Sequence, residues 1–191
     1  MKRLAIAASV ALACSAAQGQ RKPSESALQF KGTPFGTTRE QFIAAHPEFE
    51  CVTAAKFAPC PRYVVSAIPG REHMGPTYGG QPAKIITAEF DDSGLAVVLI
   101  TLSSVQFDAV TAELAKKYGK PQSRETSTVE SVGGVKKQQV ALKWPLRDGQ
   151  IDATKYAGYL GESLIQLRTP KRVADDAAAD VQRASEAQKD L

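Results

Sequence analysis

The feature that most constrains the fold is a pair of strand-forming segments joined by a tight turn. Residues 83–90 (AKIITAEF) and 95–102 (LAVVLITL) are rich in β-branched side chains. Between them, Asp91-Asp92-Ser93-Gly94 supplies residues that favour turns. The sequence therefore predicts a β-hairpin. Its second strand is apolar almost throughout, which indicates a central position in a sheet or cover on both faces.

Two amphipathic helices are predicted, one on each side of this hairpin in the sequence. The first spans residues 38–45, because Thr37 with Glu40 and Thr38 with Gln41 both have the spacing of a capping box. The second spans residues 104–118 and ends at Gly119, a residue that favours helix C-termini. The predicted buried stripe of the second helix consists of Phe107, Val110, Leu114 and Tyr118.

The region after the second helix alternates between strand-forming segments and turns. Four strands are predicted there, over residues 124–132, 135–144, 150–156 and 162–168. Pro145 is expected to end the second of these strands, because proline has no backbone N–H to donate. Shorter strands are expected near residues 28–30 and 63–68.

These elements together predict an α+β fold. We expect an antiparallel sheet of about six strands with two helices packed on it, in a single domain over residues 20–169. Thr169 and Pro170 suit the start of a further helix. This C-terminal helical extension, residues 170–191, has a thin apolar side, so we expect it to be solvated.

The first nineteen residues have the layout of a secretory signal peptide. A basic start at Lys2 and Arg3 precedes a short apolar run, and Ala17 and Gly19 provide small residues for cleavage. Cleavage would remove two of the 24 basic residues and none of the 20 acidic ones, leaving a net charge of +2. We expect a periplasmic or secreted protein with no transmembrane segment. So mild a charge does not favour nucleic-acid binding.

The cysteines bear on both stability and localisation. In an oxidising compartment, Cys51 and Cys60 are predicted to form one disulfide that holds the loop after the first helix. A zinc site that adds His46 and His73 to this pair is a disfavoured alternative, because an oxidised pair cannot bind metal as thiolates. Cys14 follows Leu12-Ala13 and so provides an alternative localisation, a lipoprotein anchored through Cys14.

The sequence carries no recognisable catalytic signature. It contains no G-x-S-x-G, H-E-x-x-H, P-loop or G-x-G-x-x-G motif, and only two histidines are present. We therefore expect neither an enzyme nor a bound cofactor or metal. A small hydrolase with an unrecognised site is kept as an alternative, because the separation of side chains in space cannot be read from a sequence.

The best candidate for a binding surface is the segment 69–82 (PGREHMGPTYGGQP). It is rich in glycine and proline, and loops held by a rigid scaffold often carry binding residues. The candidate binding residues are Arg71, His73, Met74 and Tyr78. The interpretation we favour is a non-enzymatic periplasmic or envelope-associated binding protein, whose partner could be another envelope protein. A secreted protein inhibitor is the first alternative.

Several short motifs also suggest relatives. Residues 35–41 (FGTTREQ), the spaced Cys51 and Cys60, residues 78–83 (YGGQPA) and 118–121 (YGKP) resemble segments of small uncharacterised exported proteins of Gram-negative bacteria. The helix start also resembles, distantly, the outer-membrane assembly lipoproteins of the SmpA/OmlA type and the β-lactamase-inhibitor-protein fold. The resemblance implies only a small exported α+β domain of a sort that tends to be a binding protein, and it assigns no functional residue.

Overall fold

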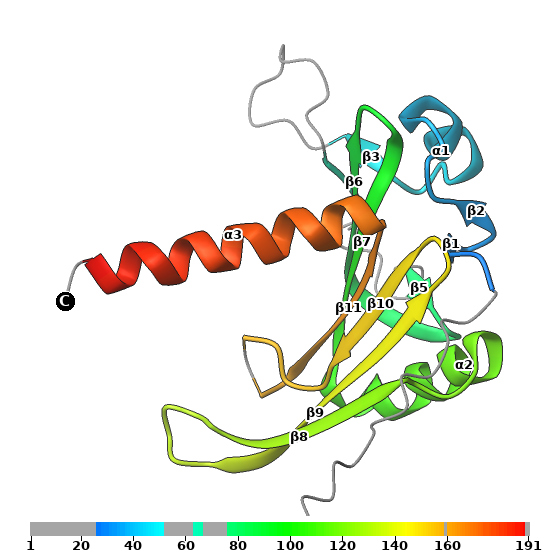
Figure 1. The fold of residues 1–191 in the computed structure, drawn as a ribbon. Helices are drawn as coiled ribbons and strands as arrows, with labels where there is room; N and C mark the ends of the chain where they lie inside the picture. Colours follow the sequence, from blue (N-terminus) through cyan, green and yellow to red (C-terminus); the bar gives the residue numbers. More distant parts are fainter. Residues whose placement is uncertain (1–25, 52–62, 67–75, 159, 190–191) are drawn as a thin grey trace, which may run out of the picture.

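A computed structural model describes residues 26–51, 63–66, 76–158 and 160–189, and its fold is α+β (Figure 1). Its helices are α1 (Arg39–Ala45), α2 (Phe107–Tyr118) and α3 (Pro170–Lys189), and one 3₁₀ turn over Ser104–Gln106 leads into α2. The strands are β1 (Gln29–Phe30), β2 (Thr33–Pro34), β3 (Glu50–Cys51), β4 (Tyr63–Ser66), β5 (Thr77–Tyr78), β6 (Gln81–Asp91), β7 (Gly94–Ser103), β8 (Ser123–Glu130), β9 (Lys136–Leu146), β10 (Gly149–Thr154) and β11 (Glu162–Arg168).

The sheet is antiparallel, as predicted, and larger than predicted. Within the described part of the chain it has nine strands, in the order β3-β4-β6-β7-β11-β10-β9-β8 with β5 paired to β6. The long strands β6 to β11 account for the expected six. The short strands β3, β4 and β5 extend the sheet on the β6 side. β4 lies within the strand expected near residues 63–68, whereas β3 and β5, of two residues each, are too short to show a clear alternation. β1 and β2 form a separate two-stranded ribbon.

The hairpin that the sequence indicated lies at the centre of the sheet. β6 and β7 pair from Ala83 opposite Leu102 to Asp91 opposite Gly94. β7 also pairs with β11 along its other edge, so its backbone is bonded on both sides. The apolar character of residues 95–102 is therefore explained by their central position, as predicted.

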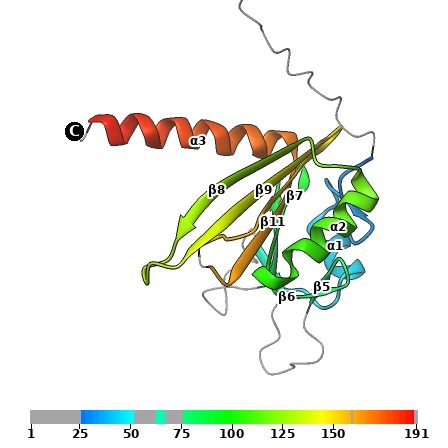
Figure 2. The same ribbon diagram turned by 90° about the horizontal axis from the view of Figure 1, so that it is seen from below.

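One face of the sheet holds the core, which α1 and α2 cover (Figures 1 and 2). The predicted stripe of α2 is buried in full. Trp144 lies beneath the end of α2, where its indole Nε1 donates to the carbonyl of Gly119 at 2.8 Å. The sheet residues of this core alternate along each strand and include Ile86, Ala88, Val98, Ile100, Leu102, Val140, Leu142, Trp144, Ile151, Ala153, Ile165 and Leu167.

Of the two predicted capping boxes at the start of α1, the structure confirms that of Thr38 and Gln41. The hydroxyl of Thr38 accepts from the Gln41 N–H at 3.3 Å, and the Gln41 side chain accepts from the Thr38 N–H at the same distance. The prediction that Pro145 ends its strand was wrong, because β9 continues through Pro145 to Leu146. β8 begins at Ser123, opposite Lys143, so at Pro145 only β10 pairs with β9. The missing N–H of Pro145 therefore breaks no hydrogen bond to β8.

The C-terminal helix begins where Thr169 and Pro170 predicted and is anchored through its first turns. Arg168 at the end of β11 contacts Asp152 of β10 at 2.5 Å and Asp176 of α3 at 2.8 Å. Arg172 reaches Glu89 of β6 at 3.4 Å. These ion pairs lie on the sheet face opposite α1 and α2, and α3 then extends away from the sheet (Figure 1). None of the described helices combines the length and apolar character needed to cross a membrane.

The loop before α1 is held directly against the start of β7. The Gly36 N–H donates to the Leu95 carbonyl at 3.0 Å, and the Leu95 N–H donates to the Thr37 carbonyl at 2.8 Å. Gly94 lies at this crossing with φ +102°, and a Cβ there would be 2.3 Å from the Gly36 carbonyl oxygen. The position therefore requires glycine for both its backbone conformation and its close contact.

We predict that Gly94→Ala lowers the free energy of unfolding by about 2–5 kcal/mol, combining a strained left-handed backbone with overpacking against a carbonyl. Gly158→Ala is the matched control, because Gly158 has φ +78° and a Cβ added there would meet nothing within 4 Å. Urea unfolding followed by Trp144 fluorescence measures both variants. Equal losses in the two variants would contradict the role given to the loop contact.

Candidate functional site

Most of the residues singled out from the sequence lie outside the described part of the chain. These are the export segment with Cys14, the cysteine Cys60, and the loop residues Arg71, His73 and Met74. The backbone of Cys51 forms β3 next to β4. The disulfide, the lipid anchor and the binding loop therefore stay predictions.

Tyr78 is the one candidate binding residue whose surroundings are described. It lies in β5 and is half-buried, with its ring stacked on Phe30 at a centroid distance of 6.1 Å. Burial, together with the nearby Tyr118, raises the pKa of its hydroxyl well above the ordinary value. Tyr78 also lines a hollow of about 270 Å³ with Val110 and Leu114. It thus packs at the margin of the core rather than projecting from a free loop.

His46 is part of the core. Its Nε2 lies 2.8 Å from the hydroxyl of Thr33, and its ring contacts Phe30, Phe42 and Phe49. Burial lowers the pKa of the imidazole, while Glu48, 3.9 Å from Nδ1, acts in the opposite direction. His46 therefore has a packing role in the structure. Among the described residues no cluster of three metal-binding side chains is found.

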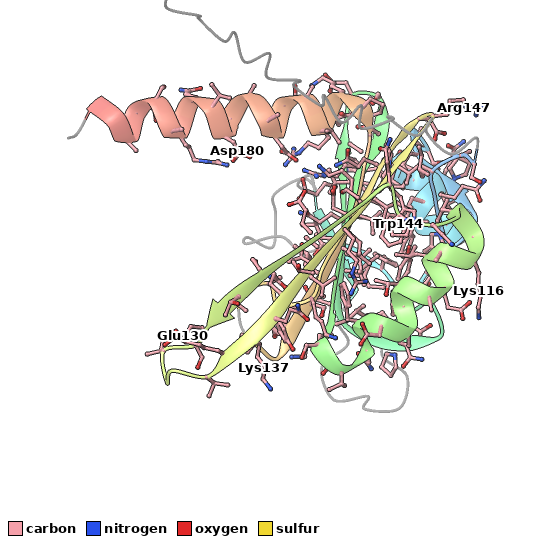
Figure 3. All side chains as sticks on the ribbon, turned by 60° about the horizontal axis from the view of Figure 1, so that its bottom comes forward. Lys116, Glu130, Lys137, Trp144, Arg147 and Asp180 are labelled. Carbon is pink, nitrogen blue, oxygen red and sulfur yellow. The ribbon has the colours of Figure 1, made fainter. Side chains whose placement is uncertain are left out.

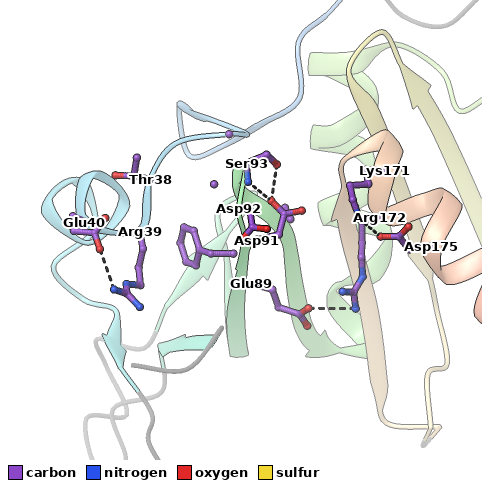
Figure 4. Close-up of a pocket in the computed structure, with 14 residues that line it drawn as sticks. Thr38, Arg39, Glu40, Glu89, Asp91, Asp92, Ser93, Lys171, Arg172 and Asp175 are labelled. Atoms are coloured by element: carbon purple, nitrogen blue, oxygen red, sulfur yellow. Dashed lines mark hydrogen bonds and ion pairs between the residues drawn. The ribbon is translucent and has the colours of Figure 1, made fainter. Parts of the chain in front are cut away.

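A hollow of about 690 Å³ lies around the β6–β7 turn (Figure 4). Asp91 is engaged in the turn, where its carboxylate accepts from the N–H and hydroxyl of Ser93 and these bonds lower its pKa. Arg172 links Glu89 to Asp176, and Lys171 pairs with Asp175. These charged groups hold the turn and α3 in place, so the hollow is better explained as a structural junction.

A projecting hairpin, which we call the arm, is formed by residues 126–138 at the outer ends of β8 and β9. Figures 1 and 3 show it extending beyond the rest of the sheet, with Glu130 and Lys137 near its end and Trp144 back in the body. β10 pairs with β9 only over residues 141–146, so no third strand among the described residues pairs with the arm. Its side chains are exposed on both faces, apart from the half-buried Val129 and Ser131.

The arm is fixed at its base and apolar at its tip. At the base, Gln139 donates to the Tyr156 carbonyl at 2.6 Å and accepts from the Tyr156 N–H at 2.9 Å. At the tip, Val132 is fully exposed and Val135 is 51% exposed. A two-stranded hairpin without a packed face is marginally stable in water. An arm of this kind, with exposed valines, is a feature that a binding partner would stabilise.

Comparison with known proteins found no related protein. No family model matches the chain, and no curated protein or solved structure shows significant similarity to it. The candidate site therefore depends on the geometry alone.

Strands were predicted over the arm from its residues, but the arm was not among the predicted binding sites. The signal was present in residues 124–138 (RETSTVESVGGVKKQ), which lack the regular apolar alternation of a strand that packs on a core. Strand-forming segments with polar residues on both faces indicate a hairpin that leaves the sheet. Only the structure shows that β10 stops short of this segment.

We predict that acid destabilises the protein through His46. Because burial lowers its pKa, the unfolded chain binds this proton more readily, so the free energy of unfolding falls as the pH drops below about 6.5. Urea titrations at several pH values measure the effect, with His46→Gln as the comparison and His73 retained in both proteins. An identical pH dependence in the two proteins would rule out His46 as the source.

Proposed function

We propose that the protein is a non-enzymatic binding protein of the bacterial envelope, exported to the periplasm or secreted, and that it binds another protein. The observation that carries this proposal is the arm. Burying Val132 against a partner would contribute roughly 1.5–3 kcal/mol, and burying Val135, which is 51% exposed, roughly half as much. The arm is held to the body by Gln139, so it presents these valines from a defined position.

The surroundings of the candidate catalytic groups also support a binding role. The His46 ring is hydrogen-bonded to the Thr33 hydroxyl and packs against an aromatic cluster. The buried hydroxyl of Ser163 donates to the Lys155 carbonyl at 2.5 Å. Both side chains already have partners that account for their positions: Ser163 has a backbone carbonyl, and His46 has the Thr33 hydroxyl on one side and the Glu48 carboxylate, 3.9 Å from Nδ1, on the other.

A secreted protein inhibitor is the second candidate, and the shape of the arm favours it. The turn that follows Glu130 is narrow and closed by the Ser131 N–H, which donates to the Val135 carbonyl at 3.0 Å. A narrow, apolar and projecting turn fits a concave site on another protein better than a flat surface. If the captured partner is an enzyme, loss of its activity on addition of this protein identifies inhibition.

We predict that a photo-crosslinking amino acid at position 132 captures a partner in the organism that produces the protein, because the Val132 side chain would be buried in the complex. The yield of this adduct should fall by more than half when Val135→Asp is added, which places a charge in the apolar contact. Capture is read by immunoblotting and mass spectrometry.

The matched control is the same crosslinker at position 116. Lys116 lies on the outer surface of α2, away from the arm, and its side chain is 72% exposed (Figure 3). No adduct at position 132, or the same adducts at both positions, would contradict the proposal that the arm is the binding surface.

A further inference from the structure

The outer edge of β8 is open. β8 is the last strand of the sheet, and no other described strand pairs with its far side. Its exposed sequence, Ser-Arg-Glu-Thr-Ser-Thr-Val-Glu over 123–130, includes two threonines and a valine, which are favoured in strands. An edge of this length offers its backbone groups to another strand.

The hydrogen bonds of the hairpin show which residues of β8 face outward. The Ser131 N–H donates to the Val135 carbonyl, so this pair bonds across the hairpin. Inward and outward bonding alternates along an antiparallel strand. The backbone groups of Arg124, Thr126, Thr128 and Glu130 therefore point away from β9, and these four residues are the available donors and acceptors.

We infer that β8 pairs with the β8 strand of a second copy of this chain, antiparallel and about a two-fold axis at Ser127. In that register the outward-facing residues of one strand meet only outward-facing residues of the other. Thr126 lies opposite the second copy's Thr128, and Ser127 lies opposite itself. All the outward backbone groups from residue 124 to residue 130 then have partners.

Charge complementarity selects this register. With Ser127 on the axis, Arg124 lies opposite Glu130 of the second copy, and the symmetry repeats this ion pair at the other end of the strand. Arg124 forms no ion pair with any other described residue, and the only described ion-pair partner of Glu130 is Lys136 at 3.6 Å. A shift of the axis by one residue would keep outward-facing residues opposite one another, but it would place Arg124 opposite Thr128 or Val132 and lose both ion pairs, so the charges decide between these registers.

Pairing in this register extends the sheet across two molecules and leaves the valine tips at opposite ends of the paired strands. The tips thus stay available to other proteins. Since only one strand from each copy takes part, the interface is smaller than that of a typical stable complex. The association is accordingly weak and depends on protein concentration.

Charge exchange tests the pairing directly. Sedimentation velocity of the purified protein over a wide range of concentrations should show a monomer–dimer equilibrium. Arg124→Glu and Glu130→Arg should each weaken the dimer about tenfold or more, because each places like charges opposite one another twice. The double variant Arg124→Glu/Glu130→Arg restores both ion pairs and should restore the dimer. Both changed positions are exposed, so circular dichroism is expected to show an unchanged fold in all three variants.

A cysteine at the symmetry axis provides a second test. Opposed residues of a pair without mutual hydrogen bonds have Cα atoms about 4.5 Å apart, which suits a disulfide. Ser127→Cys should therefore give a covalent dimer under mild oxidation, faster than the unmodified protein, which controls for the native cysteines. Thr126→Cys should not, because residue 126 lies opposite residue 128.

Each result decides the inference. A concentration-dependent dimer that both single charge variants weaken and the double variant restores, with selective cross-linking at position 127, supports it. A protein that stays monomeric at all concentrations overturns it, as does a dimer that Arg124→Glu leaves unchanged or cross-linking that is equal at positions 126 and 127. The photo-crosslinking at Val132 reports on a different surface, so either proposal can fail alone.

Discussion

The backbone bonding of β7 is the constraint on which the rest of the structure depends. β7 is paired with β6 on one edge and with β11 on the other, which joins the hairpin before α2 to the strands after it. Its first residues also bond to the loop before α1. One strand thus fixes the position of α1, the two halves of the sheet and the core beneath the helices. Its apolar side chains, among them Val98, Ile100 and Leu102, make that position stable.

Packing is distributed unevenly around this central strand. The body buries a continuous core under α1 and α2, whereas the outer halves of β8 and β9 leave it and expose both faces. The opposite face of the sheet is used differently, because ion pairs from Arg168 and Arg172 fix α3 there. The molecule is therefore a rigid body that carries two projections, an arrangement suited to contacts with other proteins.

Local features of the fold could be predicted from the sequence because the residues that cause them are neighbours in the chain. The capping box of Thr38 and Gln41, the turn at Asp91 and the buried stripe of α2 are of this kind. Pro145 was misjudged because its tolerance depends on where β8 begins, which is a tertiary fact. The short strands β3 and β5 depend on partners in the same way.

The sequence by itself determined the fold class, the central hairpin, the two covering helices and the start of the C-terminal helix, since periodicity, turn residues and caps act over a few residues. The candidate site was decided by the tertiary structure. Residues 126–138 become an arm only because β10 ends before it reaches them, and Tyr78 and His46 become packing residues only because Phe30 and Phe42 lie beside them. Whether a side chain is buried depends on contacts between distant segments, and no local pattern specifies those contacts.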